Sequence, residues 1–187
     1  MDRKKTLFVA ALAVLVAVGL RSGFGGPAPQ QGAKAPGFSA KASDGKTYSL
    51  DELLRKGPVV LYFIKADCPV NADAVRHYNR IAESYKDGKG TFLGVINGEA
   101  SVYRDWQRRF KAPFTVLYDP ELKIIGSYGA ERSPWIVALD KDGKVALTQK
   151  GFSGKELAKL NEHVARAFGK PVARISFRGA PDVPRFG

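Results

Sequence analysis

Residues 58–85 constrain the fold of this chain more than any other part of its sequence. Residues 58–64 form an unbroken apolar run, rich in β-branched and aromatic side chains. Such a run is typical of a strand buried on both faces. Residues 72–85 then repeat apolar side chains at helical spacing, at positions 75, 78, 81, 82 and 85. We therefore expect a buried strand that leads directly into an amphipathic helix.

Cys68 lies between these two elements and is followed by Pro69. Proline suits the first turn of a helix, so we expect Cys68 at or next to the helix N-terminus. The free N–H groups and the helix dipole favour a negative charge there, and a cysteine so placed tends to form the reactive thiolate. The alternative is an inert cysteine that is simply a small core residue.

Cysteine and histidine usage limits the chemistry of the chain. Cys68 is the single cysteine of 187 residues, so an intramolecular disulfide is excluded and any redox cycle needs a thiol from another molecule. His77 comes nine residues later, about 13 Å along a helix, too far to act as the base for Cys68. We expect His77 and His163 to be structural, and we expect neither a metal site nor a cofactor.

The formal net charge is +12, with lysine and arginine spread over the whole length. No motif has the spacing of a nucleic-acid-binding module, so we expect no nucleic-acid partner. A diffuse basic surface would suit contact with anionic membranes or acidic partners. A plain solvated surface is the alternative.

The N-terminus resembles a targeting segment. Basic residues at positions 3–5 precede an apolar run at 6–20, as in a secretory signal. The run is short for a spanning helix, which needs about 20 residues. Residues 1–21 are therefore either a cleaved signal peptide or an N-terminal membrane anchor. In both cases we expect export, to the periplasm or the extracellular space, or to the outer face of the cytoplasmic membrane through residues 6–20.

Composition divides the rest of the chain into three parts. Residues 22–34 are rich in Gly, Pro, Gln and Ala and read as a flexible linker. Residues 35–169 form the domain. Residues 170–187 contain three prolines and few aliphatic residues, which predicts an extended or disordered tail.

Strands and helices alternate through the domain. A strand at 46–50 precedes a short helix at 50–55, for which Ser49 and Glu52 provide a capping box. Residues 140–144 form a tight hairpin turn. Strands are expected at 58–64, 91–97, 114–118, 134–139 and 145–148. Helices are expected at 72–85, 100–110 and 153–168, and a turn that begins at 119–120 leads into a short helical piece that ends at 125. This order predicts an α/β fold: a central mixed sheet, helices on both faces, and a terminal β-hairpin plus helix.

Several short motifs occur in an order that resembles a known group of proteins. Between residues 32 and 168 the chain is similar to the thioredoxin-fold redoxins. That group joins the peroxiredoxins of the alkyl hydroperoxide reductase and thiol-specific antioxidant types with membrane-anchored thioredoxin-like proteins. The motifs are Ala35-Pro36-x-Phe38, Asp44-Gly45-Lys46, Asp67-Cys68-Pro69 and Ser133-Pro134.

The resemblance implies roles for three residues. Cys68 matches the nucleophile. Pro134 matches the cis-proline that lies against the active-site cysteine and helps to hold the substrate backbone; its alternative is an ordinary proline at a strand entry. Peroxiredoxins use an arginine near the later strand, and Arg132 lies two residues from the position that aligns with it. The alternative for Arg132 is a solvated loop charge.

The chain also departs from the patterns of its relatives. Asn71 stands where thioredoxins have their second cysteine, which excludes an internal disulfide cycle; its amide could hydrogen-bond Cys68 instead. Lys65 and Leu61 stand where the peroxiredoxin motif has threonine and proline. These two departures put peroxidase activity in doubt.

Three functions fit these observations. The first is a one-cysteine thiol oxidoreductase, an antioxidant or peroxiredoxin-like enzyme, whose partners are an external thiol reductant and either a peroxide or a protein disulfide. The second is a binding module that holds a protein partner beside Pro134 without turnover. The third is a structural protein in which Cys68 is inert.

Overall fold

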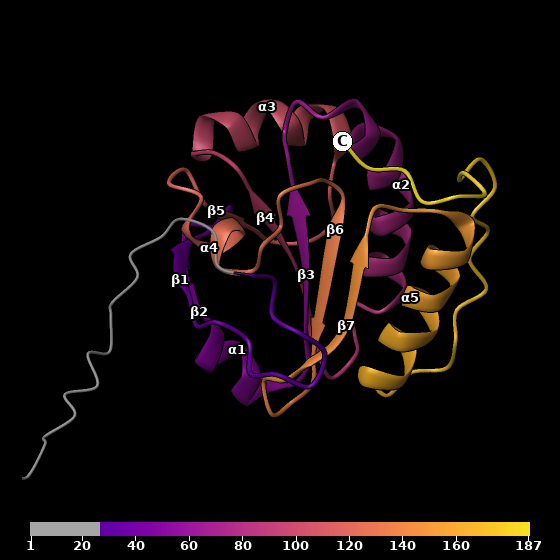
Figure 1. Cartoon of the computed structure of the whole chain (residues 1–187), viewed down its shortest axis with the longest axis horizontal. Coiled ribbons are helices and arrows are strands. Elements are labelled where there is room, and N and C mark those ends of the chain that lie inside the picture. The colour runs from indigo at the N-terminus through magenta and orange to yellow at the C-terminus, as the bar shows by residue number, and fades with distance from the viewer. Residues whose placement is uncertain (1–26) are drawn as a thin grey trace, which may run out of the picture.

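A computed structural model describes residues 27–187, so the expected signal or anchor segment lies outside the described residues. Strands and helices alternate as expected, and the α/β fold is confirmed (Figure 1). The elements are β1 (Ser39–Lys41), β2 (Thr47–Ser49), α1 (Leu50–Lys56), β3 (Val59–Ile64), α2 (Pro69–Ser84), β4 (Thr91–Ile96), α3 (Ala100–Phe110), β5 (Val116–Tyr118), α4 (Lys123–Ser127), β6 (Trp135–Leu139), β7 (Val145–Lys150) and α5 (Gly154–Ala167).

The central sheet is mixed and has the strand order β5-β4-β3-β6-β7. β3, β4 and β5 pair in parallel, whereas β6 and β7 join as antiparallel strands. The change of direction follows from the connections, because a tight hairpin joins β6 to β7 but helices cross between β3, β4 and β5. β1 and β2 form a separate antiparallel pair.

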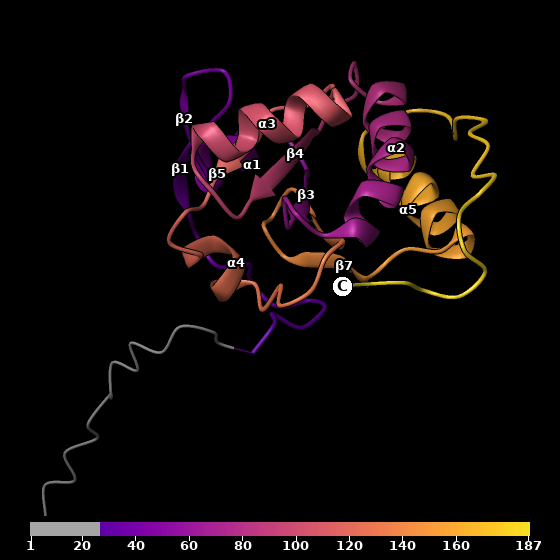
Figure 2. The same ribbon diagram turned by 90° about the horizontal axis from the view of Figure 1, so that it is seen from above.

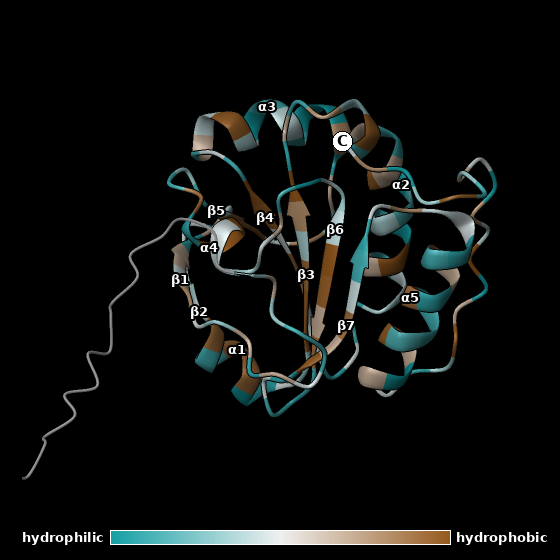
Figure 3. Ribbon diagram, viewed as in Figure 1, coloured by the Kyte–Doolittle hydropathy of each residue, from teal (hydrophilic) through white to brown (hydrophobic). Residues whose placement is uncertain are grey.

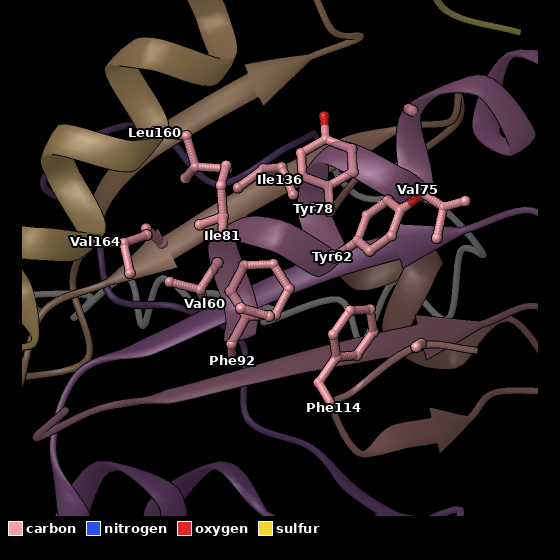
Figure 4. Close-up of a cluster of buried hydrophobic side chains, with 14 of the residues drawn as sticks. Val60, Tyr62, Val75, Tyr78, Ile81, Phe92, Phe114, Ile136, Leu160 and Val164 are labelled. Atoms are coloured by element: carbon pink, nitrogen blue, oxygen red, sulfur yellow. The ribbon is translucent and has the colours of Figure 1, made fainter. Parts of the chain in front are cut away.

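Two hydrophobic layers hold the helices on the sheet. Alternate residues of β3 face opposite sides: Val60, Tyr62 and Ile64 pack with α2, α3 and α5, while Leu61 and Phe63 belong to the layer under α1 and α4. Figure 4 shows the first layer, and Figure 2 shows α4 across the sheet from α2 and α3. This arrangement explains why β3 reads as an unbroken apolar run.

Helices α2, α3 and α5 each combine a hydrophobic and a hydrophilic face, whereas the apolar residues gather on the central strands (Figure 3).

The expected capping box of α1 is present: the Ser49 hydroxyl accepts from the Glu52 N–H, and the Glu52 carboxylate accepts from the Ser49 N–H. Local sequence therefore sets the start of this helix.

The turn expected after β5 is present, but the short helix that follows it ends at Ser127 rather than at Ile125. It begins only at Lys123, because Leu122 has a left-handed backbone with φ of 56°. The Asp119 carboxylate accepts from the Ile125 N–H at 2.8 Å, which holds the preceding turn in place.

The segments on either side of the domain are packed against it. Part of the expected linker is bound to the domain, since the Gly32 N–H donates to the Val145 carbonyl. Residues 171–187 run extended beside α5 and α2 and end near the start of α2 (Figures 1 and 2). Within residues 27–187, no helix has the length and apolar character needed to cross a membrane.

Candidate active site

Cys68 occupies the N-cap position of α2, with Pro69 in the first turn, as expected from the sequence. Its N–H donates to the Lys65 carbonyl at 3.1 Å and its carbonyl accepts from the Ala72 N–H at 3.1 Å. These two bonds fix the cysteine between the loop after β3 and the first turn of the helix. The Cys68 side chain therefore lies at the N-terminal end of α2.

The thiol is only 6% exposed and lies against the segment that enters β6. Its Sγ donates to the Ser133 carbonyl at 3.8 Å, a weak bond as expected of an S–H donor. The Ser133–Pro134 peptide bond is cis, as expected, and Pro134 is buried. The structure thus brings Cys68 beside the entry to β6.

Two polar side chains from neighbouring strands fix the loop that carries Cys68. The Ser133 hydroxyl accepts from the Lys65 N–H and donates to the Phe63 carbonyl, each at 3.2 Å. The side-chain oxygen of Asn97 accepts from the Ala66 N–H at 2.9 Å. Both side chains hold this loop in place, and the bond from the Cys68 Sγ goes to the backbone carbonyl of Ser133 rather than to either side chain.

Ser133 and Asn97 were not among the site residues expected from the sequence. The sequence did offer an indication for Asn97, because this residue directly follows β4, a buried strand parallel to β3. The carboxyl ends of parallel strands meet at one edge of a sheet, where the sites of open α/β proteins lie. Ser133 could be found only through its neighbour Pro134.

Asn71 lies where expected but does not hydrogen-bond the thiol. Its side-chain oxygen accepts from the Tyr62 hydroxyl, and its Nδ2 donates to the Lys65 carbonyl at 3.3 Å. Burial, with smaller contributions from Tyr78 and Cys68, raises the pKa of Tyr62 well above its ordinary value, which keeps the hydroxyl a neutral donor. The expectation of a hydrogen bond from Asn71 to Cys68 was therefore wrong. Asn71 instead holds the loop after β3 in place through Tyr62 and Lys65.

Arg132 is exposed, and its guanidinium lies over the ring of Phe186, with 4.7 Å between Cζ and the ring centroid. Such stacking is a cation–π contact. Arg132 also borders a small cavity of about 250 Å³ beside the Cys68 loop. The other residues that line this cavity are Phe63, Ile64, Lys65, Asn97, Leu122, Ile125, Ala130, Glu131 and Ser133.

Gly187 covers the thiol from the side of the C-terminal segment. A Cβ atom placed on Gly187 would lie 2.8 Å from the Cys68 Sγ and 3.6 Å from a methyl carbon of Val70. This approach is closer than van der Waals contact allows for a larger residue. The low exposure of Cys68 therefore depends in part on a segment far away in the sequence.

His77 is a packing residue, as expected. Its ring lies between those of Phe152 and Phe177, with 6.1 Å between centroids in each case. Burial, reinforced by Arg76 and Arg80, lowers its pKa to about 4, so the ring is neutral at physiological pH. Within residues 27–187, no three His, Cys, Asp or Glu side chains gather where a metal ion could bind.

Comparison with known proteins reveals relatives of two kinds. A model of the AhpC/TSA family matches residues 31–148. Chloroplastic peroxiredoxin Q from Triticum aestivum is 34% identical over 103 residues, which cover 53% of this chain and 46% of the relative. Thiol-disulfide oxidoreductase ResA from Bacillus anthracis is 30% identical over 129 residues, covering 68% of this chain and 73% of the relative. The chain thus spans about half the length of the matched peroxiredoxin Q.

Solved structures share the fold at lower identity. Peroxidoxin BcpB from Mycobacterium tuberculosis superposes with a TM-score of 0.63 at 19% identity, covering 74% of this chain and 97% of that one. The thioredoxin domain of a thiol-disulfide oxidoreductase from Bacteroides vulgatus gives a TM-score of 0.62 at 19% identity, covering 72% and 96%. These similarities confirm the thioredoxin-like fold.

Proposed function

Because the chain belongs to the AhpC/TSA family, we propose that it is an exported thiol redoxin in which Cys68 acts as the single nucleophile. One observation carries this proposal: the thiol sits at the N-cap of α2, against a Ser133 backbone that pairs with an extended segment. An extended polypeptide can therefore be held beside the nucleophile. This geometry favours a disulfide of a partner protein as the substrate.

The exchange uses the chain's one thiol and a second thiol from outside. The Cys68 thiolate attacks one sulfur of the partner's disulfide, forms a mixed disulfide and releases the other sulfur as a thiolate. A thiol of the partner or of a small-molecule reductant then attacks the mixed disulfide and returns Cys68 to its reduced form. Asn71 occupies the place of a resolving cysteine, so the second step is intermolecular.

Peroxide reduction is the second candidate, supported by the family match and by the similarity to peroxiredoxin Q. The thiolate would attack a peroxide oxygen, giving a sulfenic acid and releasing an alcohol or water. One external thiol would condense with the sulfenic acid and release water, and a second would reduce the resulting mixed disulfide. Lys65 and Leu61, where peroxiredoxins have threonine and proline, weigh against this reaction.

Thiol reactivity tests both candidates. Alkylation of Cys68 is measured against pH in the full chain and in a variant that lacks residues 185–187, which cover the thiol. Disulfide exchange is measured with a chromogenic dipyridyl disulfide, and peroxide loss with dithiothreitol as the reductant. We expect Cys68 to react with the alkylating agent and to turn over at least one of the two substrates. Cys68→Ser is the matched control and should remove all turnover.

The outcomes separate the candidates. Exchange without peroxide loss supports the protein-disulfide reaction, and peroxide loss that Cys68→Ser abolishes supports the peroxidase. Turnover equal to that of Cys68→Ser in both the full chain and the shortened variant contradicts both reactions. The remaining function would then be a binding module that holds a partner without turnover.

A further inference from the structure

Residues 185–187 lie extended across the start of β6 and the end of β7, at the edge of the sheet beside Cys68 (Figures 1 and 2). Gly187 and Ser133 exchange two backbone hydrogen bonds, of 2.9 and 3.0 Å. Arg185 and Phe152 exchange two more, both of 3.0 Å. Reciprocal pairs of this kind join antiparallel strands, and extended peptides use them when they bind to a sheet.

Backbone groups carry most of this attachment. Phe186 is 43% exposed and Val183 is 69% exposed, so neither side chain is buried in the domain. Among the side chains, Phe186 lies under the Arg132 guanidinium and approaches Gly151. A segment held in this way depends little on its own sequence, and another extended chain could form the same backbone bonds.

The position of Gly187 points to the role of the segment. Its Cβ position lies 2.8 Å from the Cys68 Sγ. In a disulfide with an S–S bond of about 2.0 Å, the Cβ of one cysteine lies about 3 Å from the sulfur of the other. A cysteine at this place in an extended peptide would therefore be positioned to form a mixed disulfide with Cys68.

We propose that residues 185–187 are an internal occupant of the partner-binding site, and that they keep Cys68 covered until an extended segment of a partner protein displaces them. The partner's disulfide-bonded cysteine would take the place of Gly187, and the residue two positions before it would pair with Phe152. The covering of the thiol is independent of the reaction, but its role in selecting a partner rests on the proposed function.

A cysteine introduced into the segment tests the geometry directly. The full chain carrying Gly187→Cys is treated with a dipyridyl disulfide, which takes up two protons and two electrons as two thiols form one disulfide. We expect loss of both free thiols, a mass lower by two hydrogens, and reversal by dithiothreitol. Val183→Cys, on the exposed part of the same segment, is the matched control and should keep Cys68 unpaired. Equal cross-linking of both variants, or of neither, overturns the proposal.

Access to the thiol tests the displacement. Removal of residues 185–187 should speed alkylation of Cys68 by iodoacetamide by about tenfold, because reactivity scales with the fraction of molecules in the open state. Phe186→Ala should give a smaller increase, and Val183→Ala none. A synthetic peptide of residues 180–187, added to the shortened variant, should slow alkylation again. Unchanged alkylation in both the shortened chain and Phe186→Ala overturns the proposal.

These results remain distinct from failure of the proposed function. Faster alkylation of the shortened variant without any disulfide or peroxide turnover would keep the covering segment and remove the redoxin activity. Turnover that is equal in the full and shortened chains would keep the activity and remove the covering role. If the shortened variant does not fold, the Gly187→Cys cross-link decides.

Discussion

The two halves of the C-terminal segment are held in different ways. Residues 173–180 turn apolar side chains into the core layer under α2 and α5, namely Ala173, Ile175, Phe177 and Ala180. Residues 182–187 leave their side chains exposed and are held by backbone bonds and one cation–π contact. The difference separates two roles: the first half contributes to stability, and the second controls access to Cys68.

Hydrogen bonds from three helical residues strengthen the first half. Arg80 donates to the Ser176 carbonyl at 2.9 Å, and Arg76 donates to the Gly179 carbonyl at 3.2 Å. The Asn161 amide donates to the Ala173 carbonyl at 2.9 Å. These bonds fix the path along which the second half reaches the site.

Phe177→Ala should give the largest loss of stability. It removes a half-buried aromatic side chain that packs on His77 and on the core. We expect the free energy of unfolding to fall by about 3 kcal/mol, near the lower end of the range for aromatic truncation in a core. Urea denaturation followed by circular dichroism measures this change. A loss no larger than that caused by Phe186→Ala would contradict the distinction between the two halves.

Acidification should lower the free energy of unfolding through His77, the α2 residue against which Phe177 of the first half packs. An unfolded histidine titrates near pH 6.5, whereas burial lowers the pKa of His77 to about 4. Between these values the unfolded state binds a proton that the folded state does not, so the free energy of unfolding falls as the pH falls from 6.5 to 4. We expect a contribution on the order of 2 kcal/mol.

Stability measured against pH in the native chain and in His77→Phe isolates this contribution. The variant keeps a ring between Phe152 and Phe177 but cannot titrate. The difference between the two profiles should grow below pH 6.5 and level off near pH 4. Parallel profiles would show that His77 is not the group responsible.

Tyr85→Phe should have a moderate effect, because it removes one hydroxyl from a buried network. That hydroxyl donates to the Asn161 side chain at 2.6 Å and accepts from the Ala173 N–H at 2.9 Å. Both partners would lose a bond away from solvent, at a cost of about 1 to 2 kcal/mol. Tyr48→Phe, whose hydroxyl bonds the exposed Asp44, is the matched control and should cost less.

Phe186→Ala should have the smallest effect on stability, because its ring is partly solvated and makes one stacking contact. We expect a change within about 0.5 kcal/mol, as for most exposed substitutions. Thermal unfolding and Cys68 alkylation are measured on the same sample. A clear loss of stability without faster alkylation would mean that the second half is structural, like the first.

The parts of the structure that depend on neighbouring residues could be predicted from the sequence. The Ser49 capping box, the burial of β3 and the N-cap position of Cys68 each follow from patterns within a few residues. The path of residues 171–187 could not be predicted, because it depends on partners such as Tyr85 and Ser133 that lie far away in the chain. Prolines and charged residues in this segment mask the alternation of its apolar residues.

The site, like the fold, could be predicted from the sequence only in part. Cys68 and the cis bond at Pro134 were expected, whereas the partners of Asn71 were not, because they depend on the direction of one amide within a folded loop. Arg132 was considered on the basis of resemblance alone, because it lies close to the aligned position of the arginine that peroxiredoxins use. Its contact with Phe186 depends on the docking of a distant segment, which no local pattern indicates.

The hydrogen bond between Tyr62 and Asn71 couples the effects of substitutions at these two positions. Asn71→Cys would restore the spacing of a two-cysteine oxidoreductase, but it would leave the buried Tyr62 hydroxyl without its acceptor, at about 1 to 3 kcal/mol. Tyr62→Phe removes the hydroxyl that requires this acceptor. Asn71→Cys should therefore cost less stability in a Tyr62→Phe background than in the native chain, so the effects of the two substitutions are not additive.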